Sequence, residues 1–237
     1  MIRPQRNTCR QFADLSGVWR IAFDEDGTAD WSRGIPADQA FAIAVPGSWN
    51  EQLAEAGYMN FCGAGWLETE VFLPALPPGR ALALQFGSVD YYGEVWLEGE
   101  HLGTSSAPML PFALPVPARL ATGRLARLVV RVDAQLHPDE ATQGITQSTY
   151  AEERRPRDEY LPAVRFDFFP YGGINRPVLL VERPAKGLTG WRATSDMTGV
   201  TLAVEADAGT SLRARLGDAT GGTLAEAPLT AGRADLR

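Results

Sequence analysis

Cysteine and histidine are scarce in this chain, which limits the sites that depend on them. The 237 residues include only Cys9 and Cys62, and only His101 and His137. Neither pair shows the close ligand spacing of a metal centre, so we predict no metal and no other cofactor. The two cysteines could form one disulfide, but no secretory signal is visible, and we predict reduced thiols.

The sequence also lacks long apolar runs and an excess of basic charge. Without about 20 consecutive apolar residues we predict no membrane span. The basic start at residues 1–6 is not followed by the apolar segment of a secretory signal, so we expect a cytoplasmic location. The net charge is −7 at pH 7, which argues against a nucleic-acid partner because such proteins need a basic face.

Convincing long helical patterns are missing, whereas short alternating segments are frequent. In residues 80–86, for example, Leu82, Leu84 and Phe86 alternate with small or polar residues, the period of a half-buried strand. Eight or nine such strands lie between residues 15 and 182, and Glu98-Gly99 has the chemistry of a two-residue hairpin. We predict an all-β fold that begins with an antiparallel jelly-roll β-sandwich of the galactose-binding-like kind.

A Pro- and Gly-containing linker at residues 184–187 indicates a domain boundary. We expect a jelly-roll domain over residues 12–184 and part of an immunoglobulin-like β-sandwich over residues 185–237. Three strands are predicted in this second part, at 188–193, 198–206 and 211–216. An immunoglobulin-like sandwich needs about 100 residues, so we expect this second domain to be cut short.

The most unusual stretch is residues 165–178, where a carboxylate at Asp167 stands among aromatic residues and is followed by Gly172 and Gly173. The aromatic neighbours are Phe166, Phe168, Phe169 and Tyr171. Aromatic faces beside an acid suit a sugar, because rings stack on C–H faces and a carboxylate accepts hydrogen bonds from hydroxyls. The two glycines allow a sharp turn and a close backbone approach. A hydrophobic corner of the sandwich with a solvated Asp167 is the alternative.

Other residues that could carry chemistry are better explained as structure. Acids and arginines are mixed over residues 152–159, which is typical of a solvated loop. Glu94 and Glu98 share one face of a strand and are predicted at the surface, and both histidines are predicted to be structural or exposed. Four tryptophans could be sugar platforms, but in or beside a strand tryptophan is more often core, which we predict for Trp19, Trp49, Trp66 and Trp96.

Four stretches, in this order, resemble family 2 glycoside hydrolases, most closely the β-glucuronidase branch. They are Leu-Ser-Gly-Val-Trp at 15–19, Val-Pro-Gly-Ser-Trp-Asn-Glu-Gln at 45–52, Phe-Gly-Ser-Val-Asp-Tyr-Tyr-Gly-Glu-Val-Trp-Leu at 86–97, and residues 166–178. The resemblance implies a jelly-roll sugar-binding domain at the N-terminus. It also implies that an immunoglobulin-like domain and a catalytic TIM barrel follow.

The resemblance implies a substrate contact at Asp167. In the family, an acid in an Asp-Phe-Phe-Asn-Tyr-x-Gly-Ile-x-Arg pattern hydrogen-bonds the sugar bound over the barrel. Here the pattern reads Asp-Phe-Phe-Pro-Tyr-Gly-Gly-Ile-Asn-Arg, so Asp167 takes that position, with Phe166 and Tyr171 as further substrate-binding residues.

This chain departs from the family pattern at three places. Phe166 stands where glucuronidases often carry His, and Pro170 replaces the usual Asn. At residues 104–108 the chain has Thr-Ser-Ser-Ala-Pro, where relatives tend to show His-Glu-Gly-Gly. The expected carbohydrate partner is therefore left open between a β-glucuronide and a β-galactoside type.

Catalysis by a retaining glycosidase needs two carboxyl groups about 5–5.5 Å apart. The resemblance implies that both are glutamates of the barrel, which takes about 250 residues and does not follow within this sequence. We therefore expect no catalytic residue here and no glycosidase activity of this chain alone.

Three functions remain to be distinguished. The leading one is the sugar-binding portion of a β-glucuronidase- or β-galactosidase-like hydrolase, whose partner is its own catalytic barrel. The second is a stand-alone, lectin-like carbohydrate-binding module, which needs an exposed aromatic platform. The third is a purely structural or oligomerisation domain, in which the chain forms a homo-oligomer.

Overall fold

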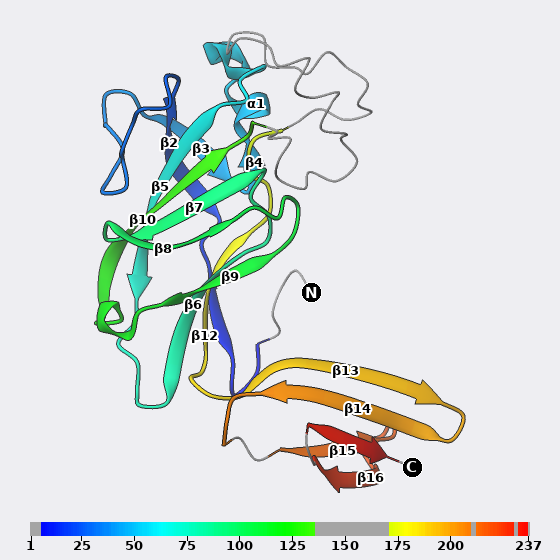
Figure 1. Ribbon diagram of the computed structural model, residues 1–237. Helices are drawn as coiled ribbons and strands as arrows, with labels where there is room; N and C mark the ends of the chain where they lie inside the picture. The colour runs from blue at the N-terminus through cyan, green and yellow to red at the C-terminus, as the bar shows by residue number, and fades with distance from the viewer. Residues whose placement is uncertain (1–5, 136–170, 210–211, 230–231, 237) are drawn as a thin grey trace. The chain divides into compact units, whose positions relative to one another are not determined.

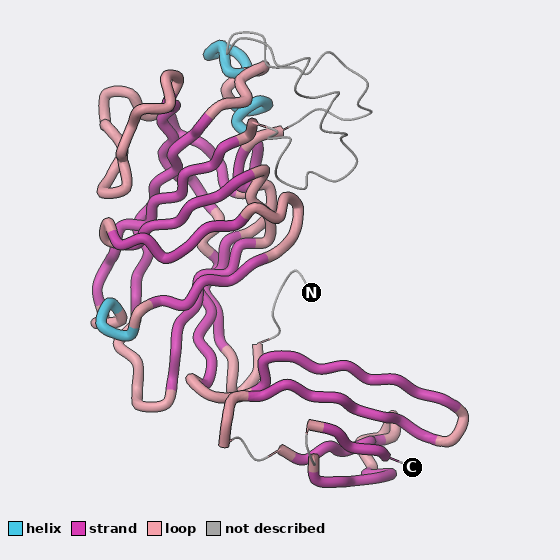
Figure 2. Tube along the Cα trace, in the orientation of Figure 1, coloured by secondary structure: helices cyan, strands magenta, loops and turns pink. Residues whose placement is uncertain are grey.

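The computed structural model of this chain describes residues 6–135, 171–209, 212–229 and 232–236 (Figure 1). The described chain consists of β-strands joined by turns, with only short helices (Figure 2). No helix in these ranges has the length and apolar character that crossing a bilayer requires. The chain divides into two compact units, a larger one of Met1–Pro77 with Ala81–Arg183 and a smaller one of Pro78–Arg80 with Pro184–Arg237.

The larger unit contains a six-stranded antiparallel sheet in the order β3-β2-β5-β10-β7-β8. Its strands are β3 (Phe41–Val45), β2 (Gly17–Asp24), β5 (Ala64–Leu73), β10 (Arg124–Asp133), β7 (Tyr92–Leu97) and β8 (Glu100–Ser105). The turn between β7 and β8 is the predicted hairpin: Glu98 and Gly99 both have positive φ angles, 54° and 77°, as a type I′ turn requires.

A four-stranded sheet in the order β1-β12-β6-β9 forms the second layer of this unit. Its strands are β1 (Gln11–Asp14), β12 (Val178–Pro184), β6 (Arg80–Phe86) and β9 (Phe112–Val116). A short ladder joins β4 (Gly47–Ser48) to β11 (Gly173–Ile174). The short helices are α1 (Trp49–Gln52), η1 (Ala54–Tyr58) and η2 (Ala118–Leu120).

One hydrophobic core lies between the two sheets. Leu82, Leu84 and Phe86 of β6 are at most 3% exposed and share a cluster with residues of the six-stranded sheet, such as Leu67 and Leu128. The alternation of β6 therefore points its apolar face inward, as the period of two predicts. The antiparallel, all-β sandwich expected from the sequence is confirmed.

The smaller unit pairs β13 (Leu188–Asp196), β14 (Gly199–Ala206) and β17 (Arg233–Leu236) in one sheet. A second sheet pairs β15 (Arg213–Gly217) with β16 (Thr223–Pro228). The sequence predicted β13, β14 and β15 but missed β16 and β17. Both are short and contain alanine together with charged residues, which have low strand propensity.

Candidate functional site

A cavity of about 390 Å³ lies where four separate parts of the larger unit meet. Its lining includes Ser48, Asp90, Met109, Tyr171, Asn175 and Arg176. Tyr171 was predicted as a substrate-binding residue and is 41% exposed. The other two predicted site residues, Phe166 and Asp167, lie outside the described residues, immediately before this segment.

Asp90 is a buried carboxylate at the wall of this cavity, only 3% exposed. It accepts hydrogen bonds from Ser88 Oγ and Asn175 Nδ2 at Oδ2 and from the Met109 N–H at Oδ1, each 2.8 Å long. A buried charge needs such donors to offset its lost hydration. One side chain thus connects the loop before β7, the β8–β9 loop and the segment after β11.

Two consecutive glycines let the segment at Tyr171 approach the rest of the sandwich closely. A Cβ atom at Gly172 would lie 2.1 Å from Cζ2 of Trp49, inside any allowed contact. Gly173 has a φ of 140°, and a Cβ atom there would lie 2.5 Å from the carbonyl oxygen of Gly47. The close backbone approach predicted from this glycine pair is therefore confirmed.

Asn50, 2% exposed, holds this glycine segment from the other side. Its Oδ1 accepts a hydrogen bond from the Gly172 N–H at 2.8 Å. Its Nδ2 donates to the carbonyl oxygens of Met59 and Phe61, at 3.0 and 2.9 Å. The Ser48 hydroxyl caps α1 by accepting from the Asn50 N–H at 3.1 Å. The stretches 45–52 and 166–178, which both carry the family resemblance, are thus joined through Asn50.

The groups at the rim can recognise a polar ligand that has a flat face. Tyr171 offers a partly exposed ring and a hydroxyl. Arg176 is half-buried and donates from Nη1 to the Met109 carbonyl oxygen at 3.0 Å. Because a guanidinium has five N–H donors, this bond leaves donors for a hydroxyl or a carboxylate. Both oxygens of Asp90 already accept hydrogen bonds within the protein. We therefore assign this acid a structural role, in which it holds the walls of the cavity together.

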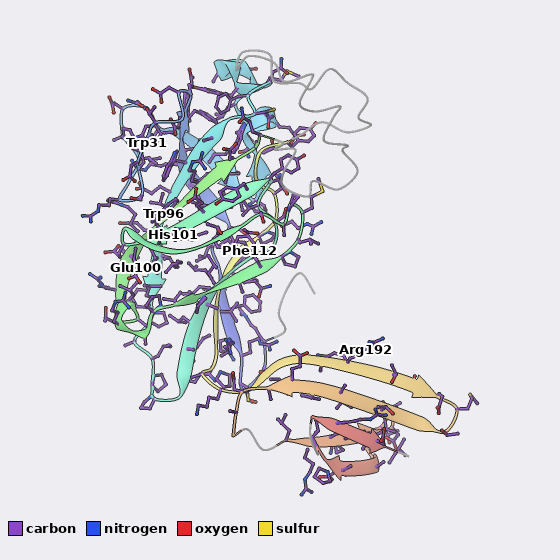
Figure 3. All side chains as sticks on the ribbon, viewed as in Figure 1. Trp31, Trp96, Glu100, His101, Phe112 and Arg192 are labelled. Atoms are coloured by element: carbon purple, nitrogen blue, oxygen red, sulfur yellow. The ribbon has the colours of Figure 1, made fainter. Side chains whose placement is uncertain are left out.

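The other candidate residues fall into structural roles. Trp19, Trp49 and Trp66 are at most 3% exposed, which confirms the core prediction. Trp96 is half-buried, with its ring centroid 5.2 Å from Trp66 and 5.3 Å from His101 (Figure 3).

The two glutamates predicted at the surface are partly exposed and paired with arginines. Glu94 accepts from Arg131 at 3.2 Å, and Glu98 lies 3.6 Å from Arg124. The charged segment 152–159 and His137 lie outside the described residues.

Sequence reasoning did not single out Asn50, Asp90 or Asn175. Each lies inside a stretch that carries the resemblance, which was the available signal, but none belongs to a short chemical motif. Asp90 and Asn175 are 85 positions apart, and only the folded chain brings them together.

Comparison with known proteins agrees with this fold. The model of the family described as "Glycosyl hydrolases family 2, sugar binding domain" matches residues 12–184. The dog β-glucuronidase is 28% identical over 222 residues, which cover 88% of this chain and 33% of that protein. The Paenibacillus borealis β-glucuronidase is 26% identical over 201 residues, covering 84% and 34%.

Solved structures show the same relationship. The Ruminococcus gnavus β-glucuronidase superimposes with a TM-score of 0.83 at 25% identity, over 99% of this chain and 38% of that chain. The Faecalibacterium prausnitzii β-glucuronidase gives 0.81 at 27% identity, over 99% and 42%. The chain spans about a third of the length of the curated relatives it matches.

Proposed function

Because this chain belongs to the family 2 glycosyl hydrolases, through their sugar-binding domain, we propose that it forms the sugar-binding part of a β-glucuronidase-like glycosidase. The observation that supports this most directly is the Asp90 cavity. Apart from Met109, its lining residues belong to three of the stretches that resemble the family, and Tyr171 of the aromatic motif is among them. The relatives' own activity, hydrolysis of β-glucuronides, is the activity that we propose for the complete enzyme.

In this proposal Asp167, Phe166 and Tyr171 contact the substrate sugar. A carboxylate accepts hydrogen bonds from sugar hydroxyls, and the aromatic rings pack on the C–H faces of the ring. The Ruminococcus gnavus enzyme has been solved in complex with D-glucaro-d-lactam, which supports a glucuronide over a galactoside as the substrate class. Arg176 offers a cation near the same cavity for an acidic sugar.

The catalytic pair belongs, in this proposal, to a TIM barrel that acts as partner of this chain. An acid/base and a nucleophile about 5–5.5 Å apart cleave the bond, while the sandwich orients the sugar beside them. Residues 12–184 form the jelly-roll domain and residues 185–237 contribute to an immunoglobulin-like sandwich.

A chimera tests this function. Residues 12–184 replace the matching domain of the Ruminococcus gnavus β-glucuronidase, and turnover of an aryl β-glucuronide is measured. The chimera is expected to be active, and Asp167→Asn should lower kcat/KM by about 10- to 100-fold, the effect of a lost charge-assisted hydrogen bond. Asp158→Asn, in the neighbouring charged segment, is the matched control and should leave kcat/KM unchanged.

Two further measurements on the 237-residue chain separate the alternatives. Turnover by the chain alone would contradict the assignment of catalysis to a barrel. Calorimetric titration with glucuronides and galactosides tests the lectin-like module, which predicts sub-millimolar binding without a barrel. If Asp167→Asn in an active, folded chimera has no effect, the acid does not contact the substrate.

A further inference from the structure

A second cavity, of about 750 Å³, lies in the larger unit and shares no lining residue with the Asp90 cavity. It is formed by the end of β2, the loop that follows, β3 and η1. Its walls include Phe23, Asp24, Trp31, Phe41 and Tyr58. This volume lies within the range of small-molecule sites, and a mixture of aromatic walls with a few polar groups is typical of them.

The aromatic walls are held in place by one another. Tyr58 stacks on Phe23 with ring centroids 3.8 Å apart, and it meets Phe41 edge to face at 5.6 Å and 71°. Trp31, on the loop between β2 and β3 (Figure 3), contacts Trp66 edge to face at 6.2 Å. Rings fixed in this way form a wall before any ligand arrives, which lowers the entropic cost of binding.

The charge of this cavity has a single sign. Three carboxylates line it, on Asp24, Glu25 and Asp26, and no lysine, arginine or histidine is found among its described lining residues. Burial, and then the charge of Glu25, raise the pKa of the Tyr58 hydroxyl, as expected beside negative charge. Such a site disfavours uronates and phosphates and favours a cation.

Asp24 supplies a carboxylate acceptor for that cation. The residue is only 5% exposed. Its Oδ1 accepts from the N–H groups of Thr28 and Ala29, at 3.0 and 3.2 Å. Its Oδ2 accepts no hydrogen bond from the residues that the structure describes and is open to solvent, because the one enclosed side-chain atom without a partner in those residues is Nε1 of Trp66.

The cation that this cavity favours is better supplied by an organic group than by a metal ion. Nowhere in the described ranges do three His, Cys, Asp or Glu side chains gather as a metal site would require. An ammonium group can donate to a carboxylate and also lie against aromatic faces, where the cation–π attraction adds to binding.

We propose that this cavity binds an organic ligand with an ammonium group, which donates to Asp24 and lies against the aromatic wall formed by Trp31, Phe41 and Tyr58. Its lining residues are not those of the Asp90 cavity. It lets the domain recognise a small organic amine.

Matched pairs of ligands test the charge requirement on the 237-residue chain. Glucosamine and glucose form one pair, benzylamine and benzyl alcohol the other, each titrated by calorimetry at pH 6 and low salt. The amine of at least one pair should bind about tenfold or more tightly than its neutral partner, and 0.5 M NaCl should weaken it. If neither amine is preferred over its neutral partner, or neither binds saturably, the proposal is wrong.

Charge variants then locate the site. Glu25→Gln removes one carboxylate from the exposed rim of the cavity. It should weaken the binding of the amine by about fivefold at 0.1 M NaCl. Glu55→Gln is the matched control, because Glu55 is exposed on η1 and does not line the cavity. Equal losses in both variants would mean that general negative charge, not this cavity, attracts the amine. Asp24→Asn should abolish the preference for the amine over its neutral partner. A thermal melt checks that this variant is folded.

Discussion

The two units of this protein differ most in what they bury. The larger unit closes two sheets on one cluster that contains large, fully buried side chains such as Trp49 and Phe86. In the described part of the smaller unit, the buried hydrophobic residues are Ala214, Ala234 and Leu236. There Trp191 remains 68% exposed and Met197 fully exposed.

The difference shows what a sandwich needs in order to hold a site. Stability from the hydrophobic effect grows with the apolar area removed from water, and alanines contribute little of it. The larger unit can therefore hold a buried carboxylate at Asp90 and a buried amide at Asn50 without losing its fold. The site lies in the unit with the larger core, and we expect the smaller unit to unfold more easily.

The largest expected effect tests this comparison directly. Leu84→Ala, in the core of the larger unit, should lower the free energy of unfolding by about 2–5 kcal/mol, because it leaves a cavity in a closed core. Leu236→Ala, the corresponding change in the smaller unit, should lower the free energy of unfolding by about 2 kcal/mol or less, because neighbouring residues can relax into the space that the side chain leaves. Urea unfolding with hydrogen exchange on peptides of each unit measures both. Equal losses would contradict the comparison.

A smaller effect is expected from Gly172→Ala, which should destabilise the larger unit by about 1–3 kcal/mol. The added methyl group would collide with Trp49, which is fully buried and cannot move aside. Gly187→Ala in the smaller unit is the control, because nothing lies within 4 Å of its Cβ position. A thermal melt of both variants is the measurement, and a melting temperature unchanged by Gly172→Ala would show that Trp49 does move.

Asp90→Asn should lower the free energy of unfolding of the larger unit by about 1–3 kcal/mol. The reason is that an amide donor then faces the N–H of Met109 or the Asn175 amide. Hydrogen exchange should increase in the peptides that contain residues 105–111 and 171–176 and remain unchanged in the smaller unit. The double variant Asp90→Asn/Asn175→Asp restores a donor–acceptor pair and should recover part of the loss. No recovery would show that the Asn175 contact contributes little.

The smallest expected effect concerns the thiols of Cys9 and Cys62. Both residues belong to the larger unit, and neither forms a disulfide. Burial raises the pKa of the Cys62 thiol to about 12, whereas Cys9 is exposed. Iodoacetamide at pH 8 should modify Cys9 first and Cys62 only after unfolding, as mass spectrometry can show. Equal rates of modification would indicate that the larger unit opens readily.

The same raised pKa makes stability depend on pH. In the unfolded chain the Cys62 thiol ionises near its ordinary pKa of about 8.5, whereas in the folded chain it stays neutral up to about 12. The unfolded state therefore loses protons first, and stability should fall as the pH rises from about 9 towards 12. A Cys62→Ala variant should show a weaker fall over this range.

The strands were predictable where one face is apolar and the period is two. In β3 and β6 the predicted bounds agree with the structure, because alternation marks the faces and Pro or Gly marks the ends. β17 was missed because its alternation of exposed residues with Ala234 and Leu236 is only four residues long. β16 was missed because the inward residues Ala225 and Ala227 give a weak apolar signal. In the site, the glycine pair and the aromatic motif stood out, but Asp90 and Asn50 did not, because polar residues inside strand-like stretches have no local signature.

The amino-acid sequence by itself determined the all-β class, the family and the close approach at Gly172-Gly173, because periodicity, motif order and glycine chemistry are local properties. Only the tertiary structure decided which polar groups meet. The bond between Asp90 and Asn175, and the carboxylate of Asp24 beside the aromatic wall, depend on how strands distant in sequence are paired and packed. Such contacts follow from the packing of the whole sandwich, because no short segment specifies them.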